Sequence, residues 1–341
     1  MIKYIHIRMK GGLKVIAAIK TFLSILMAIL NLISFPIFGN FTAATEPLDP
    51  ENCKLNFAAI SDIHMTDEEL RSFMLGFGLH DMENSKQQLD LLVCAGDLTD
   101  HGYAEEWSML EKSFAKYSPA KEIILAQGNH DTWTEDEGYD LARDLFIEYN
   151  EKITGRKTEH EYYSTKVNGY PFIVLASETD RTAAYISDAQ LAWLAAEMEA
   201  AAKDNLPIFV VCHWPLNQTH GLPETWGDDD MEPDDGGIGD QSAAVEEILK
   251  KYNNVFMITG HIHSGFSKES QEKINGYVSV ESDGSFHSIN LPSYMYMTIR
   301  GRIANGTGYQ LEVYDDRVEV RARSYSAGVW YTDYNTSIPL V

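Results

Sequence analysis

Short apolar runs, each about the length of a strand, recur through the middle of the chain. They lie at residues 57–61, 91–95, 122–126, 171–176, 208–212 and 255–259. Mostly apolar runs of this length are typical of strands that are covered on both faces of a sheet. Residues 188–203 and 240–252 lie between such runs and place apolar side chains at helical spacing. Alternating strands and helices predict an α/β fold.

The pattern changes in residues 274–323, which are rich in Tyr, Val and Ile and show almost no helical spacing. Turn signals occur at Asp283-Gly284, Asn305-Gly306 and Asp315-Asp316. We expect antiparallel strands here that complete a second sheet packed on the first. Residues 55–330 would then form one domain, preceded by a linker at 45–54 and followed by a tail at 331–341.

Residues 1–44 have the order of a targeting segment. Residues 1–20 are basic, residues 21–39 carry no charge, and Thr42-Ala43-Ala44 offers small residues for cleavage. The uncharged stretch is longer than the ~7–15 residues of a signal peptide and close to the ~20 of a membrane span, so a cleaved signal and an uncleaved anchor both remain open. Either way the rest of the chain is expected to be exported, and to be secreted or held at the outer face of the membrane by this segment.

The formal net charge of −24 limits the partners. Loss of residues 1–44, with five basic residues and no acid, would change it to −29. Such a polyanion repels extended nucleic acid, whereas a small phosphorylated substrate stays possible because bound metal cations invert the local field. Of the three cysteines, Cys94 and Cys212 lie in apolar runs, where buried inert thiols are expected, and with Cys53 they form no disulfide framework. The sequence does not indicate the oligomeric state.

Polar side chains that bind metals follow five of the apolar runs. They are Asp62 and His64, then Asp97, then Asn129, His130 and Asp131, then His213, and finally His261 and His263. One Asp or His after a strand is an ordinary loop residue. Several together indicate a site, because ligands of open α/β sheets bind at the carboxyl ends of the strands.

The ligand types indicate which metals would bind. The set holds His, Asp and Asn without a thiolate, which fits Fe, Mn, Zn or Co. These side chains are too many ligands for one ion, so we expect two transition-metal ions that share a carboxylate. Such a pair lowers the pKa of a bridging water toward ~7 and suits in-line attack of the resulting hydroxide on a phosphate ester.

The combined motifs resemble those of the calcineurin-like metallophosphoesterases. They are Asp62-x-His64, the Gly-Asp-Leu-Thr-Asp at 96–100, the Gly-Asn-His-Asp at 128–131, His213 and Gly260-His261-x-His263. The resemblance implies a four-layer α/β/β/α sandwich with a dinuclear site at the strand ends. It also implies that Asp62, His64 and His263 bind one metal, that Asn129, His213 and His261 bind the other, and that Asp97 bridges them. His130 would assist the leaving group, Asp100 would orient His130, and Asp131 would support the turn or the same imidazole.

Among possible reactions we favour hydrolysis of a phosphodiester. The Gly-Asp-Leu-Thr-Asp and Gly-Asn-His-Asp forms are similar to those of small phosphodiesterases in that family and lack the arginine of the protein phosphatase motif. An extracellular phosphomonoesterase or nucleotidase is the alternative enzyme, and a binding module with structural metals is the alternative from another class.

Other polar residues have weaker claims to a function. His101 could line the cleft or be a surface residue, and His220 and His287 could reach the substrate. Residues 224–235 carry seven acids and could form a solvated loop or a flap beside the site.

Overall fold

The computed structural model describes residues 40–41, 45–133, 138–179, 184–225, 232–233, 235–266, 277–295 and 306–341. The chain divides into two compact units, Met1–Phe41 and Thr42–Val341. In the first unit the described part is β1 (Asn40–Phe41), so most of the predicted targeting segment lies outside the described residues. No helix in the described part of the chain is long and apolar enough to cross a bilayer. The second unit is described below.

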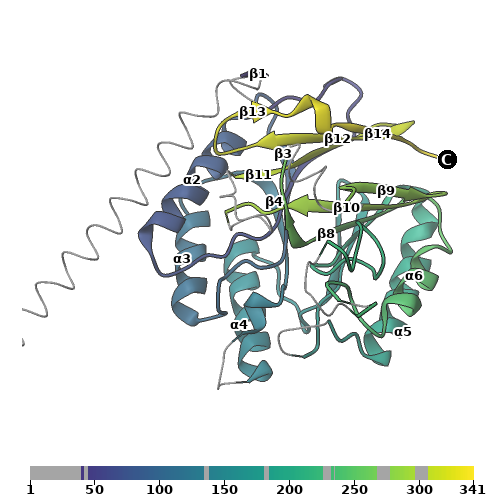
Figure 1. Ribbon diagram of the computed structural model, residues 1–341. Coiled ribbons are helices and arrows are strands. Elements are labelled where there is room, and N and C mark those ends of the chain that lie inside the picture. The colour runs from purple at the N-terminus through teal and green to yellow at the C-terminus, as the bar shows by residue number, and fades with distance from the viewer. Residues whose placement is uncertain are drawn as a thin grey trace, which may run out of the picture. The chain divides into compact units, whose positions relative to one another are not determined.

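One sheet of this unit has the strand order β13-β12-β11-β2-β3-β4, and β14 pairs with β12. Its strands are β2 (Leu55–Ile60), β3 (Leu89–Ala95), β4 (Ala120–Ala126), β11 (Thr307–Val313), β12 (Arg317–Ser324), β13 (Val329–Trp330) and β14 (Thr336–Pro339). The first three run parallel, as expected for strands joined by helices. The outer face is covered by α2 (Glu69–Glu83), α3 (Ala104–Phe114) and α4 (Tyr139–Thr154) (Figure 1).

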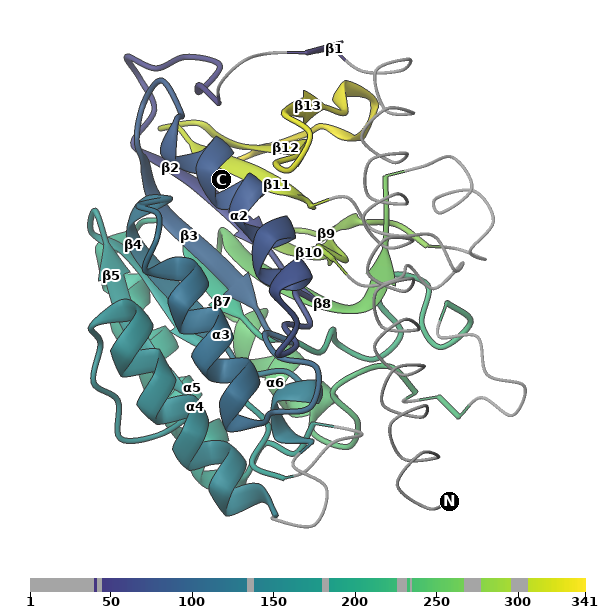
Figure 2. The same ribbon diagram turned by 90° about the vertical axis from the view of Figure 1, so that its left-hand side faces the viewer.

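The other sheet has the order β5-β6-β7-β8-β10-β9. Its strands are β5 (Tyr163–Val167), β6 (Tyr170–Val174), β7 (Ile208–Val211), β8 (Val255–Ser264), β9 (Val280–Asp283) and β10 (Phe286–Pro292). Helices α5 (Asp188–Ala201) and α6 (Ser242–Leu249) cover its outer face (Figure 1). Figure 2 looks from the opposite side, onto α2, α3 and α4. The helix patterns predicted at 188–203 and 240–252 correspond to α5 and α6.

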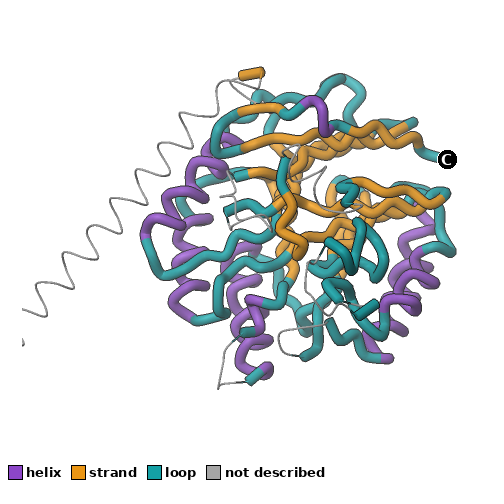
Figure 3. Tube along the Cα trace, viewed as in Figure 1, coloured by secondary structure: helices purple, strands orange, loops and turns teal. Residues whose placement is uncertain are grey.

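Three apolar layers separate the four layers of secondary structure, with strands in the middle and helices on the two outer sides (Figure 3). Alternation along β2 shows how the sequence produces this. Phe57 packs between the two sheets, whereas Ala58 and Ile60 pack under the helices. Side chains of a strand point alternately to its two faces, so a strand that is apolar throughout belongs between two cores. The predicted α/β/β/α sandwich is confirmed.

The arrangement of residues 274–323 differs from the prediction, which placed these strands in the second sheet. β9 and β10 lie there, but β11 and β12 join the first sheet, where β11 pairs antiparallel with β2. The pairing covers the edge of β2 that would otherwise expose unpaired backbone groups. Both predicted flanks also belong to the domain. In the segment 331–341, β14 pairs with β12, and in the segment 45–54 the Leu48 amide donates to the Glu312 carboxylate at 2.8 Å.

Candidate metal centre

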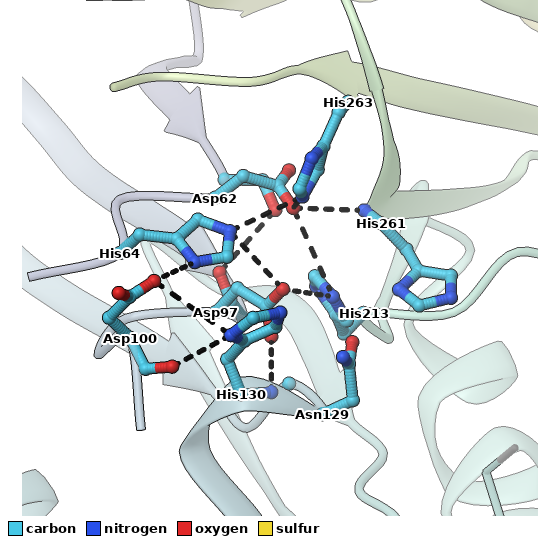
Figure 4. Close-up of polar contacts among 12 residues, drawn as sticks. Asp62, His64, Asp97, Asp100, Asn129, His130, His213, His261 and His263 are labelled. Atoms are coloured by element: carbon cyan, nitrogen blue, oxygen red, sulfur yellow. Dashed lines mark hydrogen bonds and ion pairs between the residues drawn. The ribbon is translucent and has the colours of Figure 1, made fainter. Parts of the chain in front are cut away.

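The predicted ligands come together where strands of both sheets end. Asp62 and His64 follow β2, Asp97 and Asp100 follow β3, Asn129 and His130 follow β4, His213 follows β7, and His261 and His263 lie near the carboxyl end of β8 (Figure 4). The structure therefore gathers one cluster from segments that span about 200 residues of sequence.

The backbone of the cluster is bent sharply away from the strands. Asp62, His64, Asp97, His261 and His263 have φ angles of 57°, 47°, 48°, 73° and 52°. Left-handed backbone is unfavourable for residues other than glycine, by about 1–3 kcal/mol each, and it is concentrated at functional sites. Here the bends direct side chains from different strands toward one point.

Two glycines of the motifs make room for this convergence. A Cβ atom at Gly128 would overlap the Asp97 carboxylate, and one at Gly96 would lie 2.6 Å from the His213 ring. The glycines in the Gly-Asp and Gly-Asn-His motifs are thus explained by close approach of one loop to another.

The first group of donors consists of Asp62, His64, Asp97 and His263, whose ligand atoms lie within 4.8 Å of one another. His263 Nε2 is 3.1 Å from Asp62 Oδ1 and 3.2 Å from His64 Nε2. His64 Nε2 is 3.5 Å from Asp97 Oδ2. Burial lowers the pKa of His64 to about 4, so this imidazole is neutral, as a metal ligand must be.

The second group consists of Asp97, His213 and His261, again within 4.8 Å. His213 Nε2 lies 3.2 Å from Asp97 Oδ2, and His213 Nδ1 donates to the Ala95 backbone oxygen at 2.8 Å. A hydrogen bond from the ring nitrogen that does not bind the metal fixes the orientation of a metal-binding histidine. Figure 4 shows Asn129 beside His213, on the side of the cluster that the motif resemblance assigned to it.

Asp97 belongs to both groups, and its two carboxylate oxygens have different contacts. Oδ1 accepts a hydrogen bond from the His130 amide at 2.9 Å, whereas Oδ2 lies between His64 and His213. Burial alone would raise the pKa of Asp97, but His213, His130 and His64 hold it well below its ordinary value. The carboxylate is therefore an anion with one oxygen fixed and the other directed to both groups of donors.

Several buried donor atoms of the cluster fit a cation. Asp62 Oδ2 and Asn129 Oδ1 are buried without a hydrogen-bond partner, and the buried atoms Asp97 Oδ2 and His213 Nε2 face each other at 3.2 Å. Buried lone pairs without partners are unfavourable, and metal coordination would satisfy them. The nitrogen and oxygen donors suit divalent transition metals. The thiols stay neutral, since burial raises the pKa of Cys212 to about 12 and that of Cys94 further.

His130 lies at the accessible side of the cluster, with its ring centroid 4.4 Å from that of His64. Its Nδ1 donates to the Asp100 backbone oxygen at 2.7 Å, and Figure 4 shows the other ring nitrogen directed toward the Asp97 carboxylate. The contact between Asp100 and His130 is therefore made by the main chain. The Asp100 carboxylate accepts from His64 Nδ1 at 3.0 Å and is 3.9 Å from His130.

Asp131 supports the turn, which was one of its two predicted roles. Its buried carboxylate accepts hydrogen bonds from the amides of Leu98, Thr99 and Gly128 at 3.1, 2.8 and 2.8 Å. The loops that carry Asp97 and Asn129 are thereby tied together. Asp131 is a positioning residue, not one that would touch the substrate.

Two of the other histidines serve the fold. Buried His220 bonds to the Val278 backbone oxygen at 2.6 Å and Ser288 Oγ at 2.8 Å, and buried His287 bonds to Ser282 Oγ at 2.8 Å. Of the acidic segment 224–235, residues 226–231 and 234 lie outside the described residues.

Sequence reasoning missed Asn290. This buried side chain donates to the Gly260 backbone oxygen at 2.5 Å and to Thr259 Oγ1 at 3.1 Å, next to His261. No motif could reveal it, because an Asn that contacts main chain carries no characteristic spacing.

Comparisons with known proteins agree with this geometry. A family model described as calcineurin-like phosphoesterase matches residues 55–265. A 3',5'-cyclic-nucleotide phosphodiesterase from Nostoc sp. is 25% identical over 230 residues, which cover 64% of this chain and 75% of that protein. A probable cyclic nucleotide phosphodiesterase from Fibrobacter succinogenes is 25% identical over 227 residues, which cover 64% of this chain and 77% of that protein.

Solved structures share the fold. A dimetal phosphatase from Danio rerio has a TM-score of 0.57 at 15% identity and covers 85% of this chain and 100% of its own. A purple acid phosphatase from yellow lupin has a TM-score of 0.55 at 12% identity, covering 84% of this chain and 53% of its own. At such low identity these likenesses concern the fold alone.

Proposed function

Because the chain belongs to the calcineurin-like phosphoesterase family, we propose that it hydrolyses phosphodiesters at a centre of two metal ions. The preference for a diester is supported by the motif forms and by the names of the two curated relatives, both cyclic nucleotide phosphodiesterases. The observation that carries the proposal is the position of Asp97, whose carboxylate is shared by two groups of His and Asp donors.

In this proposal Asp62, His64 and His263 hold one ion, and Asn129, His213 and His261 hold the other. Asp97, which belongs to both groups of donors, would serve both ions. When bound, two such ions neutralise charge on a phosphoryl group and lower the pKa of a water molecule.

His130 is the proposed acid. The bond from Nδ1 to the Asp100 backbone oxygen fixes the ring, so that Nε2 is the nitrogen that can donate to the leaving oxygen. The Asp100 carboxylate holds His64 in the orientation in which Nε2 points into the cluster. Asp131 keeps the loop that carries Asn129 and His130 against the loop that carries Asp97.

The variant His130→Ala tests this assignment. With bis-p-nitrophenyl phosphate as substrate, we expect kcat to fall by about 10²–10⁴-fold, while metal content by mass spectrometry stays near the ~2 ions per chain of a dinuclear site. His80→Ala makes the same change on the surface of α2 and should leave both quantities unchanged. Metal-loaded wild-type protein that hydrolyses no phosphate ester in a broad panel would instead indicate a binding module.

Comparison with p-nitrophenyl phosphate tests the diester preference. A strong bias toward this monoester would reverse the preference and favour a phosphomonoesterase or nucleotidase.

A further inference from the structure

A continuous series of aromatic rings runs from the candidate metal centre to the surface. The His130 ring centroid is 5.2 Å from that of Trp133, Trp133 is 5.6 Å from His101, and His101 is 5.4 Å from Tyr103. His101 and Tyr103 are stacked with an interplanar angle of 8°. The rings come from two loops, one after β3 and one after β4, that also supply Asp97, Asn129 and His130.

The series begins at His130, whose side chain is partly exposed, as is that of His263 at 17%. Asp62, His64, Asp97 and His213 have side chains that are at most 1% exposed, whereas the side chain of His130 is 16% exposed. Exposure then rises outward to 37% for the side chain of His101 and 37% for Tyr103. A substrate that reaches His130 therefore has the rings of Trp133, His101 and Tyr103 beside it.

The rings at the rim are held in place by a buried acid. Glu106 accepts hydrogen bonds from the His101 amide at 2.8 Å and from His101 Nδ1 at 3.1 Å. Rings fixed before binding lose little conformational freedom when a ligand stacks on them.

The charge at this rim excludes one class of ligand. The carboxylates of Glu106 and Asp100 lie 3.1 and 3.6 Å from His101 Nδ1, so a second phosphate or a carboxylate of the substrate would meet like charge. An uncharged planar group would instead gain stacking contact.

We propose that Trp133, His101 and Tyr103 bind an uncharged planar part of the substrate, so that the substrate is a phosphoester of a nucleoside and not of a small alcohol such as glycerol. This inference rests on the proposed function and narrows it. Stacking of a base on an aromatic side chain is sequence-tolerant, so the rings would accept more than one base.

Two ligands that differ only in the base test the proposal. AMP and ribose 5-phosphate share the phosphate and the sugar, and each can be measured as an inhibitor of bis-p-nitrophenyl phosphate hydrolysis. We expect AMP to bind the wild-type protein about tenfold more tightly. Trp133→Leu and Tyr103→Leu should each move the ratio of the two inhibition constants, ribose 5-phosphate over AMP, toward one. Both ligands are measured on the same variant and share a phosphate, so a loss of turnover in the variant does not change this ratio.

Tyr185→Leu is the matched control, since Tyr185 is 47% exposed and outside the ring series. It should leave the ratio unchanged. A wild-type ratio near one, or a ratio that both variants retain, would overturn the inference while leaving phosphodiester hydrolysis intact. If Trp133→Leu does not fold, the surface variant Tyr103→Leu decides.

Absence of hydrolysis would instead count against the proposed function. The same pair of ligands would then be compared by calorimetry on the metal-loaded protein, where equal affinities would again reject the aromatic site.

Discussion

The Asp100 carboxylate accepts a hydrogen bond from His64 Nδ1 at 3.0 Å, while the backbone oxygen of the same residue accepts one from His130 Nδ1 at 2.7 Å. One residue thus orients a proposed metal ligand through its side chain and the proposed acid through its main chain. Because a substitution removes only the side chain, the two roles can be separated by experiment.

We expect Asp100→Asn to weaken metal binding about 10–100-fold, the usual effect of losing an outer partner of a metal ligand. Turnover at saturating metal should recover to near the wild-type value, because the backbone contact to His130 remains. Activity measured across a Mn²⁺ titration checks this. A kcat that stays low at saturating metal would show that the carboxylate also acts on His130.

Metal removal should destabilise the domain. Chelation leaves Asp62 Oδ2 and Asn129 Oδ1 buried without hydrogen-bond partners. A ligand present at 100 times its Kd stabilises the folded state by about 2.7 kcal/mol, so Mn²⁺ should raise the Tm by several degrees over the chelated protein. The Asp97→Asn variant should lose most of this increase in Tm. A wild-type Tm that changes neither with added Mn²⁺ nor with chelator would argue against a metal centre.

Metal affinity should depend on pH through His213. Burial lowers the pKa of His213, but Asp97 and Asp62 oppose this and raise it to about 9. In the metal-free protein His213 is therefore protonated at pH 7, and an ion bound there must displace that proton. Affinity should rise about tenfold per pH unit up to pH ~9 and then level off. Calorimetry in buffers of different ionisation enthalpy measures the proton released, and affinity independent of pH would contradict the assignment.

The sequence predicted the strand ends well, because the ligands directly follow apolar runs. It could not predict which sheet receives β11, since pairing of Leu311 with Phe57 joins residues far apart in the chain, and both sheets offer an apolar face. Nor could it show that Asp100 uses its carboxylate for His64, because both imidazoles lie within reach of that loop. The stack of His101 on Tyr103 becomes meaningful only once the loop after β4 brings Trp133 beside it.

A buried ion pair joins α2 to β12. Completely buried Arg323 donates to both carboxylate oxygens of Asp81, at 2.8 and 2.7 Å. Asp81→Ala would leave the guanidinium buried without this partner, so we expect the free energy of unfolding to fall by about 3–5 kcal/mol. Asp144→Ala breaks the exposed pair with Arg143 and should cost at most about 1 kcal/mol. Urea unfolding monitored by Trp fluorescence measures the free energy of unfolding of both variants. Equal, small losses in the two variants would show that the Asp81–Arg323 pair stabilises the fold no more than the exposed pair does.

The amino terminus of exported protein distinguishes a signal peptide from an anchor. The second compact unit begins at Thr42, and its contacts include the bond from the Lys86 amide to the Thr45 backbone oxygen at 3.0 Å. Cleavage after Ala44 would leave this contact intact, so we expect protein recovered outside the cytoplasm to begin near Thr45. A variant that is produced without residues 1–44 should fold and bind metal in the same way as this exported protein. Intact-mass measurement and amino-terminal sequencing check this. Retention of Met1 on exported protein would favour the anchor, because the uncharged residues 21–39 approach the ~20 residues of a membrane span. If the protein is instead found only in the cytoplasm and retains Met1, the expected export is contradicted.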